Sequence, residues 1–181
     1  MKSSKKKIVF LAGHKGMVGS ALLRLLNKKK NCIVFLEDKK KLDLLNQEKV
    51  EKYFRKKKID ELFICAARVG GIYANMSKPA NFIYENLMIS TNLIHAAYKS
   101  NIKKILYLGS SCIYPKGIFR PIRETDLLTK SLEYTNESYS IAKISGIKLS
   151  QAYNRQYNMD IRCVMPNNLY GSNDNYDLKN S

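Results

Sequence analysis

The stretch Lys7-Ile8-Val9-Phe10-Leu11-Ala12-Gly13-His14-Lys15-Gly16-Met17-Val18-Gly19 decides how this 181-residue chain folds. Its apolar run ends at a glycine, as a buried parallel strand does. The glycines that follow have the spacing Gly-x-x-Gly-x-x-Gly and lead into a segment with helical spacing. In such a turn the first glycine permits the tight bend, the second lets the backbone approach a pyrophosphate, and the third allows helix and sheet to pack closely. Backbone N–H groups and the positive helix end can then hold phosphates.

Apolar runs and helical segments alternate along the rest of the chain. We expect strands at 7–12, 32–36, 62–67, 105–108 and 161–165, and helices at 17–29, 47–57, 79 to about 100 and 138 to about 158. Pro79 lies where proline is favoured, in the first turn of its helix. The segment 115–136 shows no clear periodicity and is expected to form a loop over the site. This alternation predicts an α/β fold: a doubly wound parallel sheet of the Rossmann type.

The composition is strongly basic, with 32 Lys and Arg against 15 Asp and Glu and a formal net charge of +17. Nucleic-acid binding therefore has to be weighed. The lysines fall in short scattered runs, and no aromatic residues alternate with them as a base-stacking platform requires. We expect a solvated surface that attracts anionic nucleotides and no specific nucleic-acid partner. The apolar runs are too short for a membrane span or a signal peptide, so we expect no membrane partner and a cytoplasmic protein.

The cysteines and histidines do not form a metal-binding pattern. Cys32, Cys65 and Cys163 lie in apolar strand-like runs and are expected to be small core residues. No CxxC pair or Cys/His cluster indicates zinc, so no metal site is predicted. His95 lies on the apolar face of the long helix, where a hydrogen-bonded structural histidine is expected. His14 is expected to shape the glycine loop.

The residues after the second strand leave the coenzyme type open. Glu37 and Asp38 follow that strand, and an acid at this position usually accepts a hydrogen bond from a ribose 2′-OH, which favours NAD. Lys39, Lys40 and Lys41 follow at once and could hold a 2′-phosphate, which favours NADP. The charges could also be ordinary surface-turn residues. Local reasoning does not choose between these alternatives.

A second group of residues suits carbonyl chemistry. Tyr139 and Lys143 are four residues apart on a predicted helix and share a face, and a lysine cation beside a phenol should lower the phenol's pKa. Such a tyrosine can donate a proton to a ketone oxygen as hydride arrives. Ser110 and Ser111 follow the fourth strand, at the sheet edge where ligands bind in open α/β folds. Cys112, in the same loop, could remove a proton next to a carbonyl, or it could be a packed thiol.

Several blocks of the sequence resemble the GDP-L-fucose synthases, a family of extended short-chain dehydrogenases/reductases. The resemblance runs from about Ile8 to Ser181. The blocks are Gly13-His14-Lys15-Gly16-Met17-Val18-Gly19, Ala66-Ala67-Arg68-Val69-Gly70-Gly71-Ile72, Leu108-Gly109-Ser110-Ser111-Cys112-Ile113-Tyr114-Pro115, Tyr139-Ser140-Ile141-Ala142-Lys143 and Tyr153-Asn154-Arg155-Gln156-Tyr157. The Ser-Ser-Cys-Ile-Tyr-Pro block separates this family from sugar-nucleotide dehydratases, which place Thr and an acid in that loop.

The resemblance implies a two-stage reaction on a GDP-4-keto-6-deoxy-mannose: epimerisation at C3 and C5, then NADPH-dependent reduction at C4. Tyr139 would donate the proton, Lys143 would tune Tyr139 and hold a ribose, Ser110 would bind the ketone oxygen, and Cys112 would be the epimerisation base. NADP is the implied cofactor. The residues expected to hold it are Gly13, His14, Lys15, Gly16, Met17, Val18, Gly19, Lys39, Leu108, Gly109, Ser110, Ser111, Lys143, Pro166, Asn167, Asn168 and Leu169.

The resemblance also sets expectations about the length of the chain. Residues 1–171 would form the coenzyme-binding domain, and 172–181 would begin a substrate region whose smaller C-terminal domain is largely missing. The family carries a catalytic histidine just after the residues matching Asn180-Ser181, so that acid would be absent and the chain would turn over poorly without the rest. We expect a homodimer in the full-length form, paired through the long helix at 81–98.

Two further interpretations of the sequence stay open. The chain could be another NAD(P)-dependent nucleotide-sugar epimerase. It could also be a non-catalytic module that binds a dinucleotide on the same fold, because a fold alone does not fix a function.

Overall fold

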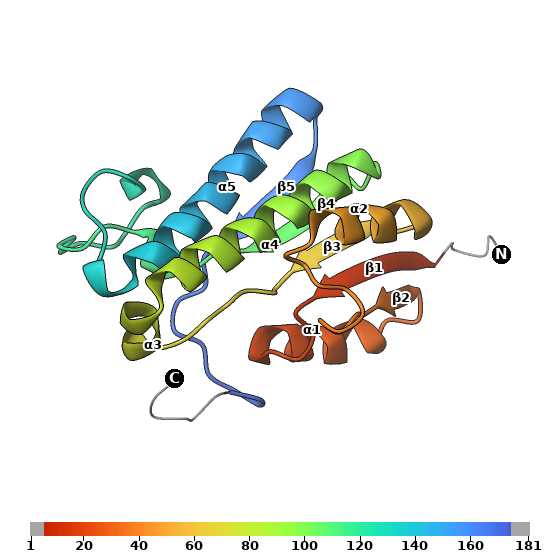
Figure 1. Cartoon of the computed structure of the whole chain (residues 1–181), viewed down its shortest axis with the longest axis horizontal. Coiled ribbons are helices and arrows are strands. Elements are labelled where there is room, and N and C mark those ends of the chain that lie inside the picture. Colours follow the sequence, from red (N-terminus) through yellow and green to blue (C-terminus); the bar gives the residue numbers. More distant parts are fainter. Residues whose placement is uncertain (1–5, 175–181) are drawn as a thin grey trace.

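Five parallel strands form the centre of the molecule. The structure, a computed structural model, describes residues 6–174. The strands follow the order β2-β1-β3-β4-β5, and every neighbouring pair is parallel (Figure 1). They are β1 (Lys7–Ala12), β2 (Cys32–Phe35), β3 (Glu61–Ile64), β4 (Lys104–Leu108) and β5 (Asp160–Val164). Because all the strands run the same way, their carboxyl ends meet at one edge. The predicted Rossmann-type sheet is confirmed.

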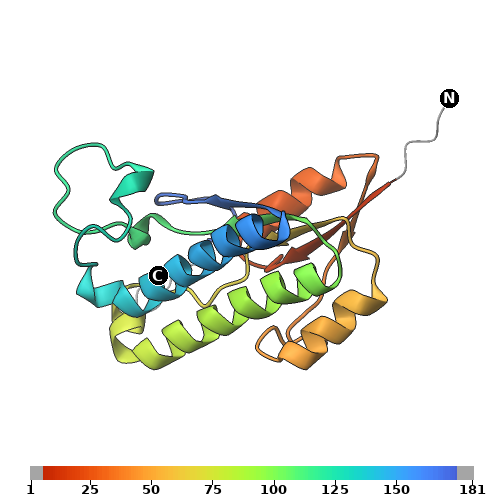
Figure 2. The same cartoon turned by 90° about the horizontal axis from the view of Figure 1, so that it is seen from above.

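Helices cover both faces of the sheet. They are α1 (Met17–Asn27), α2 (Gln47–Lys56), α3 (Ile72–Ser77), α4 (Pro79–Lys99) and α5 (Glu137–Tyr157). Figure 2 shows α1 on one side of the strands and α2, α4 and α5 on the other, with α4 between its two neighbours. The direction of chain progression reverses between β1 and β3, where the strand order switches. In open α/β sheets, ligands bind at the carboxyl side of such a switch point.

The main core lies between the sheet and the layer formed by α2, α4 and α5. Alternate strand residues such as Phe10, Leu62 and Tyr107 point into it and are almost completely buried. Burying one such side chain contributes about 2 kcal/mol. Tyr107 also forms a polar link, because its hydroxyl lies 3.0 Å from the Ser90 hydroxyl on α4. On the other side of Tyr107 lies α5, where a Cβ at Gly146 would collide with the tyrosine hydroxyl.

The structure differs from the sequence-based expectation mainly in short elements. The long strands and helices begin and end within a few residues of the predicted positions. β3 ends at Ile64 rather than at residue 67, because the chain then leaves the sheet. The short helix α3 was not predicted, since six residues are too few to show a period. Three 3-10 turns, at Ser111–Ile113, Glu124–Asp126 and Tyr134–Asn136, lie in the loop segments after β4.

The expectation that three cysteines are core residues is corrected by the structure, whereas the expectation for His95 is confirmed. Cys32, Cys65 and Cys163 are only partly buried, and Cys163 packs against the hydrophobic core. They lie at the start of β2, just past β3 and on the outermost strand β5, where fewer neighbours cover a side chain. His95 Nδ1 lies 2.7 Å from the Tyr153 hydroxyl, which confirms a hydrogen-bonded helix histidine.

Residues 1–5 and 175–181 lie outside the described residues, so the expectations about Asn180-Ser181 and about a substrate region at 172–181 have no structural counterpart here beyond residue 174. The predicted domain boundary at 171 stays a prediction. Within residues 6–174, no helix is both long and apolar enough to cross a membrane, and no group of three His, Cys, Asp or Glu side chains gathers as metal ligands would.

Candidate active site

The glycine turn between β1 and α1 is closed by backbone packing. Gly13 has a φ of +88°, and a Cβ there would lie 2.5 Å from the backbone nitrogen of Ala66. A Cβ at Gly19 would collide with the Gly13 carbonyl oxygen. The same oxygen accepts a hydrogen bond from the Gly16 backbone N–H at 3.2 Å. Around Gly16 itself there is room, with the nearest atom 3.6 Å from an added Cβ. The turn is therefore fixed in shape and leaves backbone open at Gly16.

A groove of about 390 Å³ lies at this turn, along the carboxyl ends of β1, β2 and β3. Five residues predicted from the sequence line it: Gly13, His14, Lys15, Gly16 and Lys39. Met17, Val18 and Gly19 form the first turn of α1 behind it. Other lining residues were not predicted from the sequence; they are Leu42, Asp43, Leu44, Leu45, Ala66, Ala67, Arg68, Glu85 and Ile89. The groove thus offers backbone N–H groups and cations at one place and apolar side chains at another.

The two acids that follow β2, Glu37 and Asp38, have different partners. The Asp38 carboxylate lies 2.7 Å from Lys15 Nζ and 3.4 Å from His14 Nε2. The hydrogen bond from Lys15 is the main reason why the pKa of Asp38 is below its ordinary value. Glu37 instead lies by Tyr53, where burial and then the charge of Glu37 raise the pKa of the phenol to about 12. The glycine turn and the end of β2 are thereby joined through Asp38.

Arg68 is the most informative lining residue that the site prediction did not include. The Arg68 backbone N–H donates to Asn86 Oδ1 at 2.9 Å, and Asn86 Nδ2 donates to the Arg68 carbonyl at 3.0 Å. Its guanidinium lies 2.6 Å from Glu85 and packs over the Phe82 ring, 5.3 Å from the centroid. Its Nε is buried without a hydrogen-bond partner. A cation with a spare donor beside a groove suits an anionic ligand. Its position just after a strand end is the signal that could have revealed it.

The second part of the site lies at the end of β4. Lys143, on α5, is 3% exposed, and its Nζ donates a hydrogen bond of 2.7 Å to the Leu108 carbonyl. The ammonium lies 5.0 Å from the centroid of the Tyr107 ring and 5.8 Å from that of Tyr139. Burial disfavours the charged form and lowers the pKa of Lys143 to about 8. Near neutral pH this ammonium is charged but easily deprotonated.

Tyr139 does not have the pKa that the sequence analysis expected. Burial, followed by the charge of Cys112, raises the pKa of its phenol to about 12, while hydrogen bonding by Ser110 acts in the opposite direction. Lys143 faces the ring but does not offset this, because its hydrogen bond goes to the backbone of Leu108. Lowering of the phenol's pKa therefore requires a change around Tyr139, such as a ligand that alters its hydrogen bonds.

The Ser110–Cys112 loop is held against α5. The Cys112 backbone N–H donates to Ser110 Oγ at 3.3 Å, and Ser140 Oγ donates to the Cys112 carbonyl at 2.8 Å. Ser140 follows Tyr139 directly, so these bonds fix the loop relative to the phenol. The Cys112 thiol is partly buried. Ser110, Cys112, Tyr139 and Lys143, predicted from separate segments, are brought together.

The segment after β5 connects the two parts of the site. Ser111 donates its backbone N–H to the Pro166 carbonyl at 3.1 Å and its hydroxyl to the Asn167 side chain at 3.3 Å. Further along, Asn173 Nδ2 donates to Ser20 Oγ on α1 at 3.0 Å. The chain therefore passes from the end of β4 to the start of α1. Leu169 lies within this span and is half exposed. Leu108 is the last residue of β4, and Gly109 follows it.

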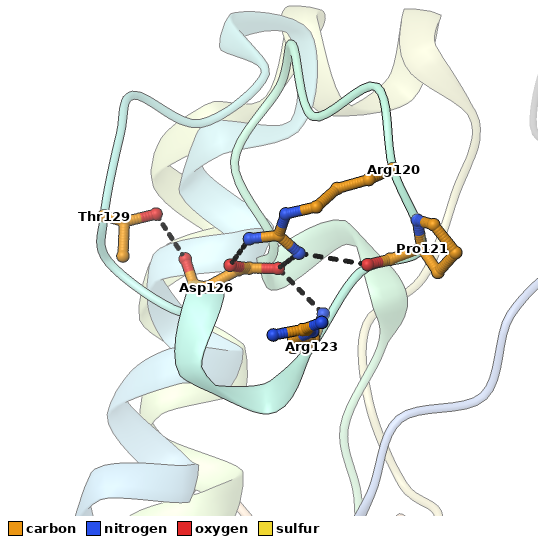
Figure 3. Close-up of polar contacts among 5 residues, drawn as sticks. All are labelled: Arg120, Pro121, Arg123, Asp126 and Thr129. Carbon is orange, nitrogen blue, oxygen red and sulfur yellow. Dashed lines mark hydrogen bonds and ion pairs between the residues drawn. The ribbon is translucent and has the colours of Figure 1, made fainter.

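The predicted loop at 115–136 is folded around one carboxylate (Figure 3). Asp126 accepts hydrogen bonds from both terminal nitrogens of Arg120, at 2.6 and 2.9 Å, and from the Arg123 backbone N–H at 2.7 Å. Thr129 Oγ1 donates to the Asp126 carbonyl. Arg120 lowers the pKa of Asp126 by hydrogen bonding to its charged form. The loop that leads into α5 is thus an ordered structure rather than an irregular one.

The geometry agrees with the comparison to known proteins. A model of the NAD dependent epimerase/dehydratase family matches residues 9–181. The chain belongs to this family. Among family members, it is 51% identical over 176 residues to "GDP-L-fucose synthase" of Escherichia coli, and 53% identical over 175 residues to the protein of that name in Sinorhizobium fredii. In both cases 97% of this chain is matched but only 55% of the relative.

Solved structures also resemble this chain. A GDP-D-glycero-L-gluco-heptose synthase from Campylobacter jejuni, crystallised in the presence of NADPH, superposes with a TM-score of 0.91 at 37% identity. The match covers 98% of this chain and 52% of that one. The chain therefore spans about half the length of the epimerase/dehydratase family members that it matches.

Proposed function

We propose that this chain is the coenzyme-binding and catalytic part of a GDP-L-fucose synthase, which acts on a GDP-4-keto-6-deoxy-mannose by 3,5-epimerisation and NADPH-dependent 4-reduction. The observation that carries the proposal is the convergence of Ser110, Cys112, Tyr139 and Lys143 at the carboxyl end of β4, on the same edge of the sheet as the groove. The identity to two proteins named GDP-L-fucose synthase supports it.

The groove fits NADP by the chemistry of its donors. The start of α1 behind Gly16, the cations Lys15 and Lys39, and the guanidinium of Arg68 suit its phosphates. Apolar side chains such as Leu44 and Ile89 suit the adenine. When bound, NADPH supplies the hydride for C4. The C. jejuni structure with NADPH supports this choice of coenzyme.

In the proposed reduction, the protein's own groups control one proton and one carbonyl oxygen. Ser110 Oγ donates a hydrogen bond to the C4 oxygen. Tyr139 donates its proton to the same oxygen as negative charge develops there. The buried Lys143 ammonium lies 5.8 Å from the centroid of the Tyr139 ring, so a ligand that drew it from the Leu108 carbonyl toward the phenol would let it stabilise the phenolate that remains. In the free chain the high pKa of Tyr139 keeps the proton in place.

In the proposed epimerisation, Cys112 as thiolate removes the protons from C3 and C5, which are acidic because each is next to the C4 ketone. The hydrogen bonds from Ser110 and Tyr139 stabilise the resulting enolate oxygen. A second group must return the proton from the opposite face. The family resemblance gives this role to a histidine beyond Ser181, so complete turnover requires sequence corresponding to the other half of the relatives.

The remaining expectations about partners belong to the same proposal. The substrate is a GDP-sugar, the full-length protein is a cytoplasmic homodimer, and the positive charge serves anionic nucleotides rather than a specific nucleic acid.

NADPH titration of the purified chain, followed by nicotinamide fluorescence, tests the proposal first. Binding is expected for the wild type and for Tyr139→Phe. Turnover is then measured with the remaining half supplied from the E. coli relative. Tyr139→Phe should lose reduction, and Cys112→Ser should lose solvent deuterium incorporation at C3 and C5. Wild-type turnover by Tyr139→Phe would contradict the catalytic assignment.

A second candidate substrate is a GDP-heptose, because the C. jejuni synthase matches almost the whole chain. The same complemented protein distinguishes the two. Faster turnover of a GDP-4-keto-heptose than of the 6-deoxy-hexose would favour this alternative. NADPH binding without turnover of either sugar would favour a non-catalytic module.

A further inference from the structure

The coenzyme groove has an unusual combination of charges where β2 ends. Asp38 and Lys15 both line the groove and form an ion pair with each other at 2.7 Å. In nucleotide-binding α/β folds, an acid at this position accepts a hydrogen bond from the ribose 2′-OH of NAD, whereas a cation nearby accommodates the 2′-phosphate of NADP. Here both the acid and the cation are present, and they form an ion pair with each other.

We propose that Asp38 and Lys15 form a specificity pair that lets this groove bind both NAD(H) and NADP(H). Asp38 accepts the ribose hydroxyl hydrogen bond of the unphosphorylated coenzyme. Lys15 leaves Asp38 to bind the 2′-phosphate of the phosphorylated one. This inference rests on the coenzyme groove of the proposed function and concerns which coenzymes the groove accepts.

Both members of the pair are free enough to exchange partners. The Lys15 side chain is 72% exposed and that of Asp38 is 48% exposed. Water weakens such an ion pair, so little is lost when it opens. Lysine carries its charge on a long flexible stem and can move between two anions close to each other without moving the backbone. The backbone of Lys15 lies within the closed glycine turn, so the side chain alone has to move.

The surroundings limit the repulsion between Asp38 and a 2′-phosphate. His14 Nε2 lies 3.4 Å from the Asp38 carboxylate, and Lys39 lines the same groove. Glu37, the neighbouring acid, lies by Tyr53. One carboxylate therefore faces several potential cations. Its negative charge should reduce, but not reverse, the attraction of this part of the groove for a phosphate. We expect the dissociation constants for NADPH and NADH to differ by about tenfold or less.

The experiment measures dissociation constants of the purified chain for NADPH and NADH by nicotinamide fluorescence, without turnover. Asp38→Asn removes the charge that repels a phosphate but keeps the size. It should bind NADPH about threefold to tenfold more tightly and NADH more weakly. Lys15→Met should bind NADPH about tenfold more weakly while NADH binding changes little. The two variants therefore shift the preference in opposite directions.

Two matched controls lie at the amino ends of the strands, away from the groove. Asp160 pairs with Arg162 at 2.9 Å and is 44% exposed, so Asp160→Asn is chemically equivalent to Asp38→Asn. Lys7 pairs with Glu61 at 2.8 Å, so Lys7→Met controls for Lys15→Met. Both controls should keep the wild-type ratio of the two dissociation constants.

The outcomes separate this inference from the proposed function. If the wild type binds neither coenzyme, both proposals fail. If it binds a coenzyme but Asp38→Asn and Lys15→Met change NADPH and NADH affinity by the same factor, or not at all, the specificity pair is wrong and the proposed function stands. Salt gives an independent readout: NADPH affinity should fall more steeply with ionic strength than NADH affinity, and Lys15→Met should reduce that difference.

Discussion

The two halves of the site are built in different ways. At the end of β1 the groove is made of close-packed backbone, with exposed ion pairs at its rim. At the end of β4 the reactive group is made of side chains, and its lysine and tyrosine are largely buried. The first half should therefore tolerate changes of charge but not an added carbon atom at its tightest points. In the second half, changes of charge should affect both stability and chemistry.

The largest effect that tests this contrast is expected for Gly19→Ala. The new Cβ would collide with the Gly13 carbonyl oxygen, and backbone on both sides has to move. We expect a loss of about 3 kcal/mol in the free energy of unfolding, measured in urea.

Gly16→Ala is the matched control for that change. The nearest atom to its Cβ is 3.6 Å away, so the free energy of unfolding should change by less than about 1 kcal/mol. Its methyl group would instead stand where the backbone is open to a ligand, and NADPH binding should weaken. Equal destabilisation by the two alanines would show that the glycine turn is not held by close packing.

A second prediction concerns the buried lysine. The pKa of Lys143 is about 8 in the folded chain and near 10.5 when unfolded. Below pH 8 both states are protonated, and the folded state carries the full penalty of a buried charge. The free energy of unfolding of the wild type should therefore rise as pH increases from about 8 to 10.5, because Lys143 loses its proton in the folded state before it does so in the unfolded state. The variant Lys143→Met lacks this gain, so its stability relative to the wild type should fall by up to about 3 kcal/mol over that range.

The measurement is urea unfolding of both proteins at intervals from pH 7 to 10.5. Tyr139 is present in both proteins, so its own titration largely cancels in the difference. Lys148→Met, at an exposed position of the same helix, should leave the wild-type pH profile in place. A stability difference between Lys143→Met and wild type that does not vary with pH would contradict the buried charge.

The smallest effect is expected in the loop around Asp126. Arg120 keeps the pKa of this carboxyl below its ordinary value of 3.8, so its stabilisation is present above pH 3.8 and is lost as pH falls further. Asp126→Asn should lose the paired hydrogen bonds to Arg120 at every pH. Hydrogen exchange of the amides at 120–129 should then speed up, with little change in global stability.

Asp160→Asn, which breaks an exposed ion pair on β5, serves as the control for the loop. Unchanged exchange at 120–129 in Asp126→Asn would show that other contacts hold the loop. It would also weaken the expectation that a change of charge beside α5 affects its surroundings, because Asp126 holds the segment that leads into α5 by hydrogen bonds.

The sequence predicted what depends on long periodic segments and on backbone spacing. The strand at Lys7–Ala12 and the glycine turn were predictable because an apolar run followed by regularly spaced glycines is typical of a strand that leads into a phosphate-binding turn. The short helix at Ile72–Ser77 was not, because it is held by the Asn75 side chain, whose Nδ2 bonds the carbonyls of Gly70 and Gly71. Such a side-chain contact leaves no period in the sequence.

The closeness of the candidate residues was predictable from the sequence, but their electrostatics were not. The positions of Tyr139 and Lys143 four residues apart indicated a shared face, and the structure places the ammonium 5.8 Å from the ring centroid. The direction of the pKa change at Tyr139 was wrong, because burial depends on what covers the phenol and the sequence does not show this. Arg68 was not predicted as a site residue for a similar reason, because only the structure shows that it lines the groove.

Ser90, Tyr107 and Gly146 bring α4, β4 and α5 into one contact beneath Lys143. A larger residue at 146 fits only if the ring at 107 becomes smaller, and a residue at 107 without the hydroxyl leaves Ser90 with only its hydrogen bond to the Asn86 carbonyl. Substitutions at these three positions should therefore be inherited together among homologues, and a library that redesigns the reaction centre should vary them as one block.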